Sequence, residues 1–355
     1  MTTLIDWDLA ARTAKRLSPG PPAVSRYEAD EVVGEFYQAA SRAGTHVAEL
    51  THLHEPPVTA ATRVIERHAW IDANAGGMRS VLAPVVDKLT ADKSVGRFGE
   101  QFGSKLTGAQ VGAVLGFLSG KVLGQFEFFD RPGGQLLLVA PNLVAVERQL
   151  QLTPSDFRLW VCLHEVTHRV QFTAIGWLRQ HMLDEIGALT DALDTDPAAL
   201  RKRLSAAANE LAKAVRGRGE HHGGEVLPGG LMAVLATPEQ RAVLDRVSAF
   251  MSVVEGHAEY VMNAVDSSVI PTQAAIEQRF AVRRRKGGNP LDRLLRKLLG
   301  MEAKTRQYVD GSAFVRAVIK RVGVDDFNAI WTSRETLPTK AEIAAPQQWI
   351  ARVHA

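Results

Sequence analysis

Residues 153–176 place two histidines and a glutamate inside an apolar helix, and no other segment constrains the fold as strongly. Thr153, followed by a proline and with Asp156 three residues later, is typical of a helix start. The apolar residues that follow recur at helical spacing and share a face with His164 and His168. This face is expected to point inward. Because unpaired polar groups in a core are costly, the rest of the chain must supply partners for these side chains.

Residues 164–168 read His-Glu-Val-Thr-His, which is the HExxH pattern of zinc hydrolases. Positions four apart lie on one face of a helix, so His164 and His168 can bind a single Zn²⁺. Glu165 stands beside the first histidine, where its carboxylate can act as a general base toward water that the ion activates. Two surface histidines on an ordinary helix would give the same letters by chance, but the apolar context favours a metal site.

A catalytic zinc site needs a third protein ligand, which must come from outside the motif helix. Residues 254–260 read Val-Glu-Gly-His-Ala-Glu-Tyr and follow a second helix start at Thr237. Glu255 and Glu259 share a helix face, so we expect Glu255 to bind the metal and Glu259 to accept the N–H of a ligand histidine. His257 points away from Glu255 and is expected to pack or to face solvent. The alternatives for the third ligand are Glu185, Glu259, and His221 and His222 in the glycine-rich loop at 215–230.

Composition and charge exclude several classes of protein. An apolar content of 46% with 23% charged residues is ordinary for a globular chain. A net charge of +3 is too small to indicate a nucleic acid or a membrane as partner, and the basic run at 283–286 lacks the interleaved aromatic residues of a base-stacking surface. The single cysteine, Cys162, excludes an internal disulfide and fits a reducing compartment. We see neither a signal peptide nor an apolar stretch long enough for a bilayer, and expect a cytoplasmic protein.

Helical signals dominate the chain, with one clear strand. Residues 135–140 read Gln-Leu-Leu-Leu-Val-Ala after a Pro-Gly-Gly turn, and we expect a strand whose exposed edge could take up an extended peptide. An amphipathic stretch lies at 290–300. The expected helices cover 6–17, 25–43, 58–92, 106–124, 155–176, 237–265, 311–322, 324–331 and a short segment capped by Thr339 and Glu342.

Glycine recurs at every fourth residue from Gly108 to Gly124, which on a helix forms a bare ridge that lets a neighbouring helix approach closely. We expect a mainly α fold in which the N-terminal helices and this ridged helix enclose the motif helix, with a small β element beside it. The chain shows no repeat and no clear domain boundary. We treat it as one domain with an N-terminal helical part (1–104), a metal-site core (105–270) and a C-terminal helical part (271–355).

The motifs together resemble a known class of peptidase. HExxH followed by Glu-Gly-x-Ala-x-Tyr, here residues 255–260, is similar to the gluzincin arrangement, in which the glutamate before the glycine is the third zinc ligand; the resemblance implies this role for Glu255. Nearly the whole chain resembles a family of zincin-like metallopeptidases and hydrolases of actinobacteria and their relatives, a subset of which is associated with deazaflavin-cofactor biosynthesis. The segment between His168 and Glu255 is longer than in well-known gluzincins, so the third ligand stays open. The stretches that carry the family resemblance are 108–119, 159–172, 255–262 and 306–308.

The predicted function is hydrolysis of a peptide or protein by one Zn²⁺ per chain, held by the two motif histidines and Glu255, with Glu165 as the base. The developing oxyanion needs a further donor. An alternative function is that of a zinc protein without peptidase activity, in which the metal joins helices and Glu165 has no role. Neither the substrate nor the oligomeric state follows from the sequence. The candidate oxyanion donors are Tyr308, Tyr260, Arg306 and His257.

Overall fold

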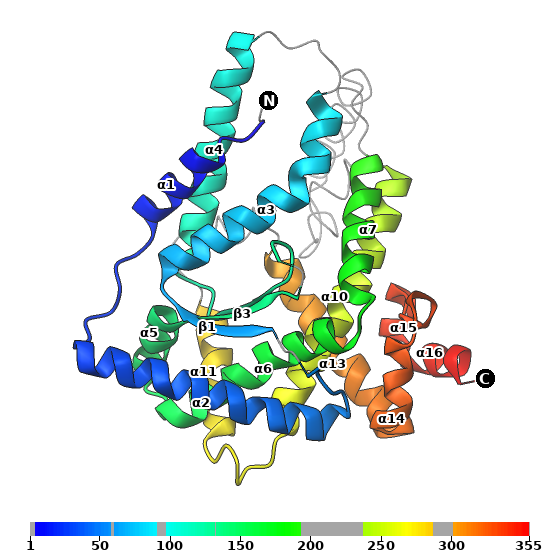
Figure 1. Cartoon of the computed structure of the whole chain (residues 1–355). Helices are drawn as coiled ribbons and strands as arrows, with labels where there is room; N and C mark the ends of the chain where they lie inside the picture. Colours follow the sequence, from blue (N-terminus) through cyan, green and yellow to red (C-terminus); the bar gives the residue numbers. More distant parts are fainter. Residues whose placement is uncertain are drawn as a thin grey trace, which may run out of the picture.

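Helices surround a small sheet in the structure, a computed structural model that describes residues 4–57, 60–90, 97–131, 133–192, 237–286 and 301–354 (Figure 1). The N-terminal half comprises α1 (Trp7–Leu17), α2 (Arg26–Thr51), β1 (Ala61–Ile65), α3 (Arg67–Thr90), α4 (Arg97–Ser119), β2 (Gly124–Glu127), β3 (Gln135–Val139), α5 (Ala140–Leu150) and α6 (Pro154–Ala174). The remainder comprises α7 (Leu178–Asp191), α10 (Pro238–Ala264), α11 (Gln273–Lys286), α13 (Met301–Val322), α14 (Val324–Phe327), the 3₁₀ turns η2 (Asn328–Trp331) and η3 (Arg334–Thr336), α15 (Lys340–Ala344) and α16 (Pro346–Val353).

The sheet has the strand order β1-β3-β2, with β1 parallel and β2 antiparallel to β3. The strand predicted at 135–140 is present as β3, but the prediction that it offers an exposed edge is wrong. It is the central strand and all five of its residues are buried, which accords with an apolar run that is covered on both faces. The edges belong to β1 and β2. Because β2 packs against α6, an edge strand still lies beside the motif helix.

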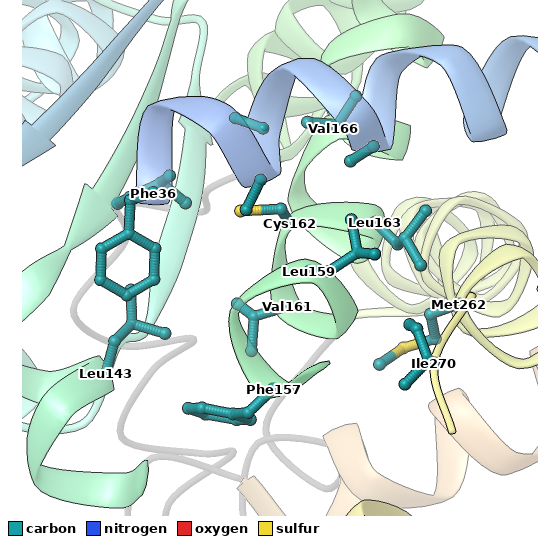
Figure 2. Close-up of a cluster of buried hydrophobic side chains, with 14 of the residues drawn as sticks. Phe36, Leu143, Phe157, Leu159, Val161, Cys162, Leu163, Val166, Met262 and Ile270 are labelled. Atoms are coloured by element: carbon teal, nitrogen blue, oxygen red, sulfur yellow. The ribbon is translucent and has the colours of Figure 1, made fainter. Parts of the chain in front are cut away.

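The motif helix α6 is the centre of the main core. It packs against α2, α10, α11 and the sheet, and Figure 2 shows the apolar side chains that α6 contributes, including Cys162, meeting those of neighbouring elements. The helix begins at Pro154 as predicted. Thr153 makes no side-chain cap bond, and the Asp156 carboxylate instead accepts hydrogen bonds from the backbone N–H and hydroxyl of Thr272. Asp156 therefore ties the start of α6 to the segment before α11.

The glycine ridge lies on α4 and does receive a neighbouring helix, but that neighbour is α1. A Cβ added at Gly108 or at Gly112 would lie 2.5 Å from the backbone oxygen of Asp6 or of Ala10, so the two helices touch along their backbones. The prediction that this helix encloses α6 is wrong, since α1, α3 and α4 build a separate apolar cluster on the other side of the sheet from α2 (Figure 1). The helix ends at Ser119, so the last two glycines of the ridge, Gly120 and Gly124, lie outside it. Gly124 is the first residue of β2.

Several other helix predictions differ from the structure. The helix expected at 311–322 begins already at Met301, and the one expected at 324–331 is the short α14 followed by the 3₁₀ turn η2. The region 58–92 contains the strand β1 before α3, because residues 61–65 pair with β3 in the interior of the fold. Helix α2 starts after Ser25 as predicted but continues to Thr51. The amphipathic stretch at 290–300 and the glycine-rich loop at 215–230 lie outside the described residues. Of the helices in the described ranges, none is long and apolar enough to cross a membrane.

Helix α10 is clamped between α6 on one side and α13 on the other. It starts with the predicted capping box, in which Thr237 and Gln240 bond to each other's backbone N–H. Gly256 of α10 meets Gly311 of α13, and a Cβ on either glycine would overlap the backbone of the opposite helix. This crossing fixes the position of α10 directly beside Glu255.

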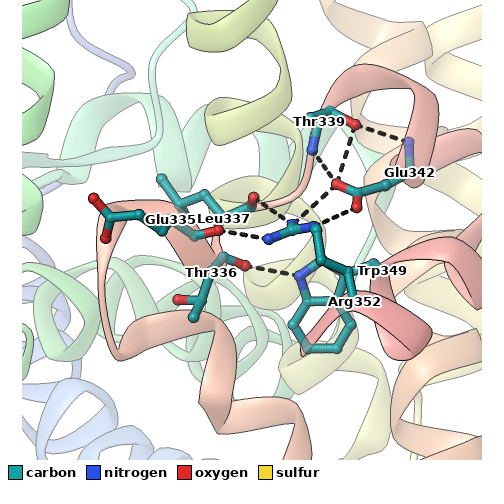
Figure 3. A network of polar contacts seen from close by, with 7 residues as sticks. All are labelled: Glu335, Thr336, Leu337, Thr339, Glu342, Trp349 and Arg352. Atoms are coloured by element: carbon teal, nitrogen blue, oxygen red, sulfur yellow. Dashed lines mark hydrogen bonds and ion pairs between the residues drawn. The ribbon is translucent and has the colours of Figure 1, made fainter. Parts of the chain in front are cut away.

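The C-terminal segment is held by a polar network on Arg352 (Figure 3). The Arg352 guanidinium donates to both oxygens of Glu342 and to the carbonyl oxygens of Glu335 and Leu337. Glu342 also forms the predicted capping box with Thr339, which starts α15. Because α15 and α16 pack on α13, this network stabilises the segment that lies against α13. Helix α13 in turn packs on α10.

Candidate metal centre

His164, His168 and Glu255 come together where α6 crosses α10, and they form the group of described residues that could hold a metal ion. The two histidine Nε2 atoms lie 3.2 Å apart. Glu255 Oε2 lies 3.5 Å from Nε2 of His164 and 3.4 Å from Nε2 of His168. The two rings stand nearly perpendicular, at 87°. All three potential ligand atoms thus face one point from two helices.

The spacing of these atoms fits a zinc ion. Ligand atoms bound to tetrahedral Zn²⁺ at about 2.0–2.2 Å lie about 3.3–3.6 Å from one another, and the three separations here are 3.2, 3.4 and 3.5 Å. Glu255 Oε2 is buried and has no hydrogen-bond partner within the described part of the chain. A buried carboxylate oxygen without a donor is costly. A cation among the three atoms would satisfy it.

The electrostatics of His168 and Glu255 also favour a bound cation. Burial disfavours the charged form of His168, but the Glu255 carboxylate outweighs it and raises the pKa of His168 to about 8. Burial likewise opposes ionisation of Glu255, yet the two histidines hold the pKa of its carboxyl well below the usual range. The three side chains therefore attract positive charge into the space between them, either as a proton on His168 or as a metal ion.

Glu165 is held between α6 and the start of β2. A Cβ added at Gly124 would lie 2.6 Å from Cγ, 2.8 Å from Cδ and 3.0 Å from Oε1 of Glu165. The side chain of Glu165, the residue after His164, thus packs directly against the backbone of the edge strand at Gly124. Only glycine leaves room for it. The sequence showed Gly124 as part of a helical ridge, and nothing local indicated this contact.

Gln171 was not predicted from the sequence. It contacts His168 on the ring nitrogen that faces away from Glu255. Its Oε1 lies 3.0 Å from His168 Nδ1, and its Nε2 donates to the Val254 carbonyl oxygen at 3.0 Å and lies 3.1 Å from His257 Nδ1. The available signal was a glutamine three residues beyond the motif, on the inward face of an apolar helix. A buried amide in that position needs polar partners and finds them at the metal site.

His257 packs in the interior, which is one of the two outcomes expected for it. Its ring contacts Phe327 and Trp331, with centroids 5.4 and 5.5 Å away. Burial and the nearby charge of His168 lower the pKa of His257 to about 3, so the ring is neutral. Because its Nδ1 faces Gln171, His257 contacts the metal site only through that amide.

The other predicted site residues fall into three groups. Glu185 pairs with Arg246 at 2.8 Å instead of joining the histidines, and His221 and His222 lie outside the described residues, as do the side chains of Tyr308 and Arg306 on α13. Glu259 and Tyr260 are half-buried on α10, where burial raises the pKa of the tyrosine. The roles predicted for Glu259, Tyr260 and Tyr308 stay predictions.

Comparison with known proteins agrees with this geometry. A family described as zincin-like metallopeptidase matches residues 5–350. The chain belongs to this family. Zinc is the metal that membership implies, and the family is one of metallohydrolases. The group on α6 and α10 is where the described residues could hold that zinc.

Among solved structures, the chain is similar to a protein from Chloroflexus aurantiacus whose crystal structure is described as that of "a putative hydrolase with a novel fold". The identity is 30%, the TM-score is 0.71, and the match covers 99% of each chain. The likeness therefore extends to both helical ends of the zincin-like chain as well as to the motif helix. Curated proteins gave no match.

Proposed function

We propose that this zincin-like protein is a zinc-dependent peptidase that binds one Zn²⁺ through His164, His168 and Glu255. The observation that carries the proposal is the spacing of the three ligand atoms, which lies within about 0.1 Å of that expected for tetrahedral zinc. Structural zinc sites use four protein ligands, whereas catalytic sites use three and leave one position open. The described residues offer a group of three, which favours hydrolysis over the alternative of a zinc protein without peptidase activity.

Glu165 is the proposed general base. A zinc ion held at this site supplies Lewis acidity, which makes water acidic enough to yield a nucleophile near neutral pH. Glu165 would take the proton from the attacking water and deliver it to the leaving amine. Its side chain is buried and lies against Gly124, which limits the conformations open to its carboxylate.

A peptide or protein is the proposed substrate, and β2 is the element that could align it. As an edge strand packed on α6, β2 offers backbone groups to an extended chain, the mode of recognition in which a peptide adds a strand to a sheet. This assigns to β2 the role that the sequence suggested for residues 135–140. A cytoplasmic location and the absence of nucleic-acid and membrane partners stay predictions.

The test combines metal analysis with turnover of a quenched fluorescent peptide library. Wild-type protein loaded with zinc should cleave peptides, and Glu165→Gln should keep its zinc while losing about two to four orders of magnitude of turnover, the usual range for proton transfer by a positioned side chain. Glu185→Gln is the matched control, because that carboxylate lies in an ion pair away from the site. Full activity of Glu165→Gln would exclude it as the base, and zinc binding without any turnover would favour the non-peptidase alternative.

A further inference from the structure

Gln171 is completely buried and bridges the two helices that carry the metal ligands. It extends from α6, one turn beyond the motif, to the backbone of Val254 on α10, the residue directly before Glu255. Its amide group lies within 3.1 Å of His168, Val254 and His257. All of its hydrogen-bonding capacity is thus directed at the surroundings of the metal site.

The Val254 carbonyl decides which way the amide points. A carbonyl oxygen can only accept a hydrogen bond, so the Gln171 NH₂ group must face Val254 and the amide oxygen must face His168. The amide oxygen is in turn only an acceptor, so His168 Nδ1 must carry a proton. When the ring is neutral, as a metal ligand must be, the remaining nitrogen Nε2 carries the lone pair and faces Glu255 and His164.

The same reasoning fixes His257. The second N–H of the Gln171 amide points at His257 Nδ1, which must therefore be an unprotonated acceptor. His257 is held as the neutral ring with its proton on Nε2. One backbone carbonyl thus determines, through one amide, the proton positions on two buried imidazoles.

We propose that Gln171 is a positioning residue for the metal site: its amide holds His168 in the tautomer that ligates through Nε2 and joins α6 to the turn of α10 that carries Glu255. The proposal rests on the zinc site of the proposed function. A ligand histidine is commonly oriented by a partner on its other ring nitrogen, and loss of such a partner lowers metal affinity about 10–100-fold. In this chain the partner of His168 is the neutral amide of Gln171, which orients the imidazole ring without adding a further buried charge.

The experiment measures Zn²⁺ affinity of the full-length protein by competition with a chelator. Gln171→Met, similar in length but without polar atoms, should weaken binding about 10–100-fold. Gln171→Glu keeps an acceptor for His168 Nδ1–H but loses the donor to the Val254 carbonyl oxygen, so it should weaken binding by less than Gln171→Met does. Gln125→Met is the matched control, because Gln125 also bridges two polar groups, Trp70 Nε1 and Asn74 Oδ1, but faces α3. Its zinc affinity should be unchanged.

Each outcome decides the matter. Unchanged affinity in Gln171→Met would overturn the proposal. An equal loss in Gln171→Met and Gln171→Glu would overturn the role of Gln171 as acceptor for His168, because the lost acceptor would then not be the cause. Should Gln171→Met fail to fold, ¹⁵N spectra of zinc-loaded, histidine-labelled wild type give the answer: His168 should carry its proton on Nδ1 and His257 on Nε2, and the opposite tautomers would refute the proposal. If wild type itself binds no zinc, the proposed function fails instead.

Discussion

Gly124→Ala is the substitution that tests most sharply how Glu165 is positioned. Gly124 lies in β2 and is not among the glycines with a left-handed backbone, so alanine fits its conformation without strain. The three heavy atoms nearest to the added methyl group would all belong to Glu165, with Cγ at 2.6 Å. The main effect of the substitution should therefore pass through the proposed base.

The magnitude follows from that distance. Carbon atoms in contact lie about 3.5–4.0 Å apart, so Glu165 or the strand must give way by about 1 Å. Overpacking of this kind costs about 1–3 kcal/mol of stability. A displacement of about 1 Å at a reacting group lowers turnover about 100-fold. Zinc affinity should change little, because Glu165 is not one of the three proposed ligands.

Thermal unfolding, zinc titration and peptide turnover measure the three effects. Gly187→Ala is the matched control, since Gly187 is a helical glycine in α7 with nothing within 4 Å of an added Cβ. It should leave activity unchanged and raise stability by up to about 1 kcal/mol through helix propensity. A second control places Gly124→Ala in a Glu165→Ala background, where the methyl group no longer meets the glutamate and Tm should stay constant.

Two results would refute this reasoning. Full activity and unchanged Tm in Gly124→Ala would mean that the contact is not tight in solution. An equal loss of Tm in the Glu165→Ala background would mean that the methyl group disturbs the sheet rather than Glu165, since two residues that interact directly should show non-additive effects.

Three further predictions concern the ligand set, the buried histidine and the helix crossing. Glu255→Gln should lower zinc affinity in chelator competition by more than the roughly 10–100-fold expected for an outer partner; retained affinity would direct attention to Glu259. Because burial lowers the pKa of His257 to about 3, against about 6.5 when unfolded, the unfolded chain binds more protons between these values. The contribution of His257 to the free energy of unfolding should then fall by about 1.4 kcal/mol per pH unit as pH drops below about 6. Urea titrations at several pH values should show a weaker dependence of this free energy on pH for His257→Phe. Gly311→Ala should cost at least about 3 kcal/mol in the same titrations, because its methyl group would overlap the backbone carbonyl of Ser252; stability equal to wild type would mean that α13 can move away from α10.

Local patterns were sufficient for much of the helical architecture. The capping boxes at Thr237 and Thr339 start α10 and α15 where the sequence predicts, because the bonds of a cap involve residues three apart. The HExxH spacing likewise places two imidazoles on one face of α6 whatever surrounds it. Glu255 could be proposed because its own helix carries a recognisable pattern, and the structure brings it to both histidines.

Local sequence patterns did not predict the strand order of the sheet. The strand at 61–65 looked helical, and β3 was expected at an edge, because strand order depends on pairing between segments that are distant in the chain. The glycine ridge was visible in the sequence, but its partner was not. Any helix with a suitable face could have packed there, and the fold placed α1 on it.

By itself, the sequence determined which side chains share a helix face, and it thereby predicted a metal-binding pair with a base. Only the tertiary structure decided what stands around them. Gly124 leaves room for Glu165, Gln171 fixes the proton of His168, and the Gly256–Gly311 crossing sets the distance of Glu255. The physical reason is that helix periodicity depends on neighbours three or four residues away, whereas these contacts join segments brought together by the packing of the whole core.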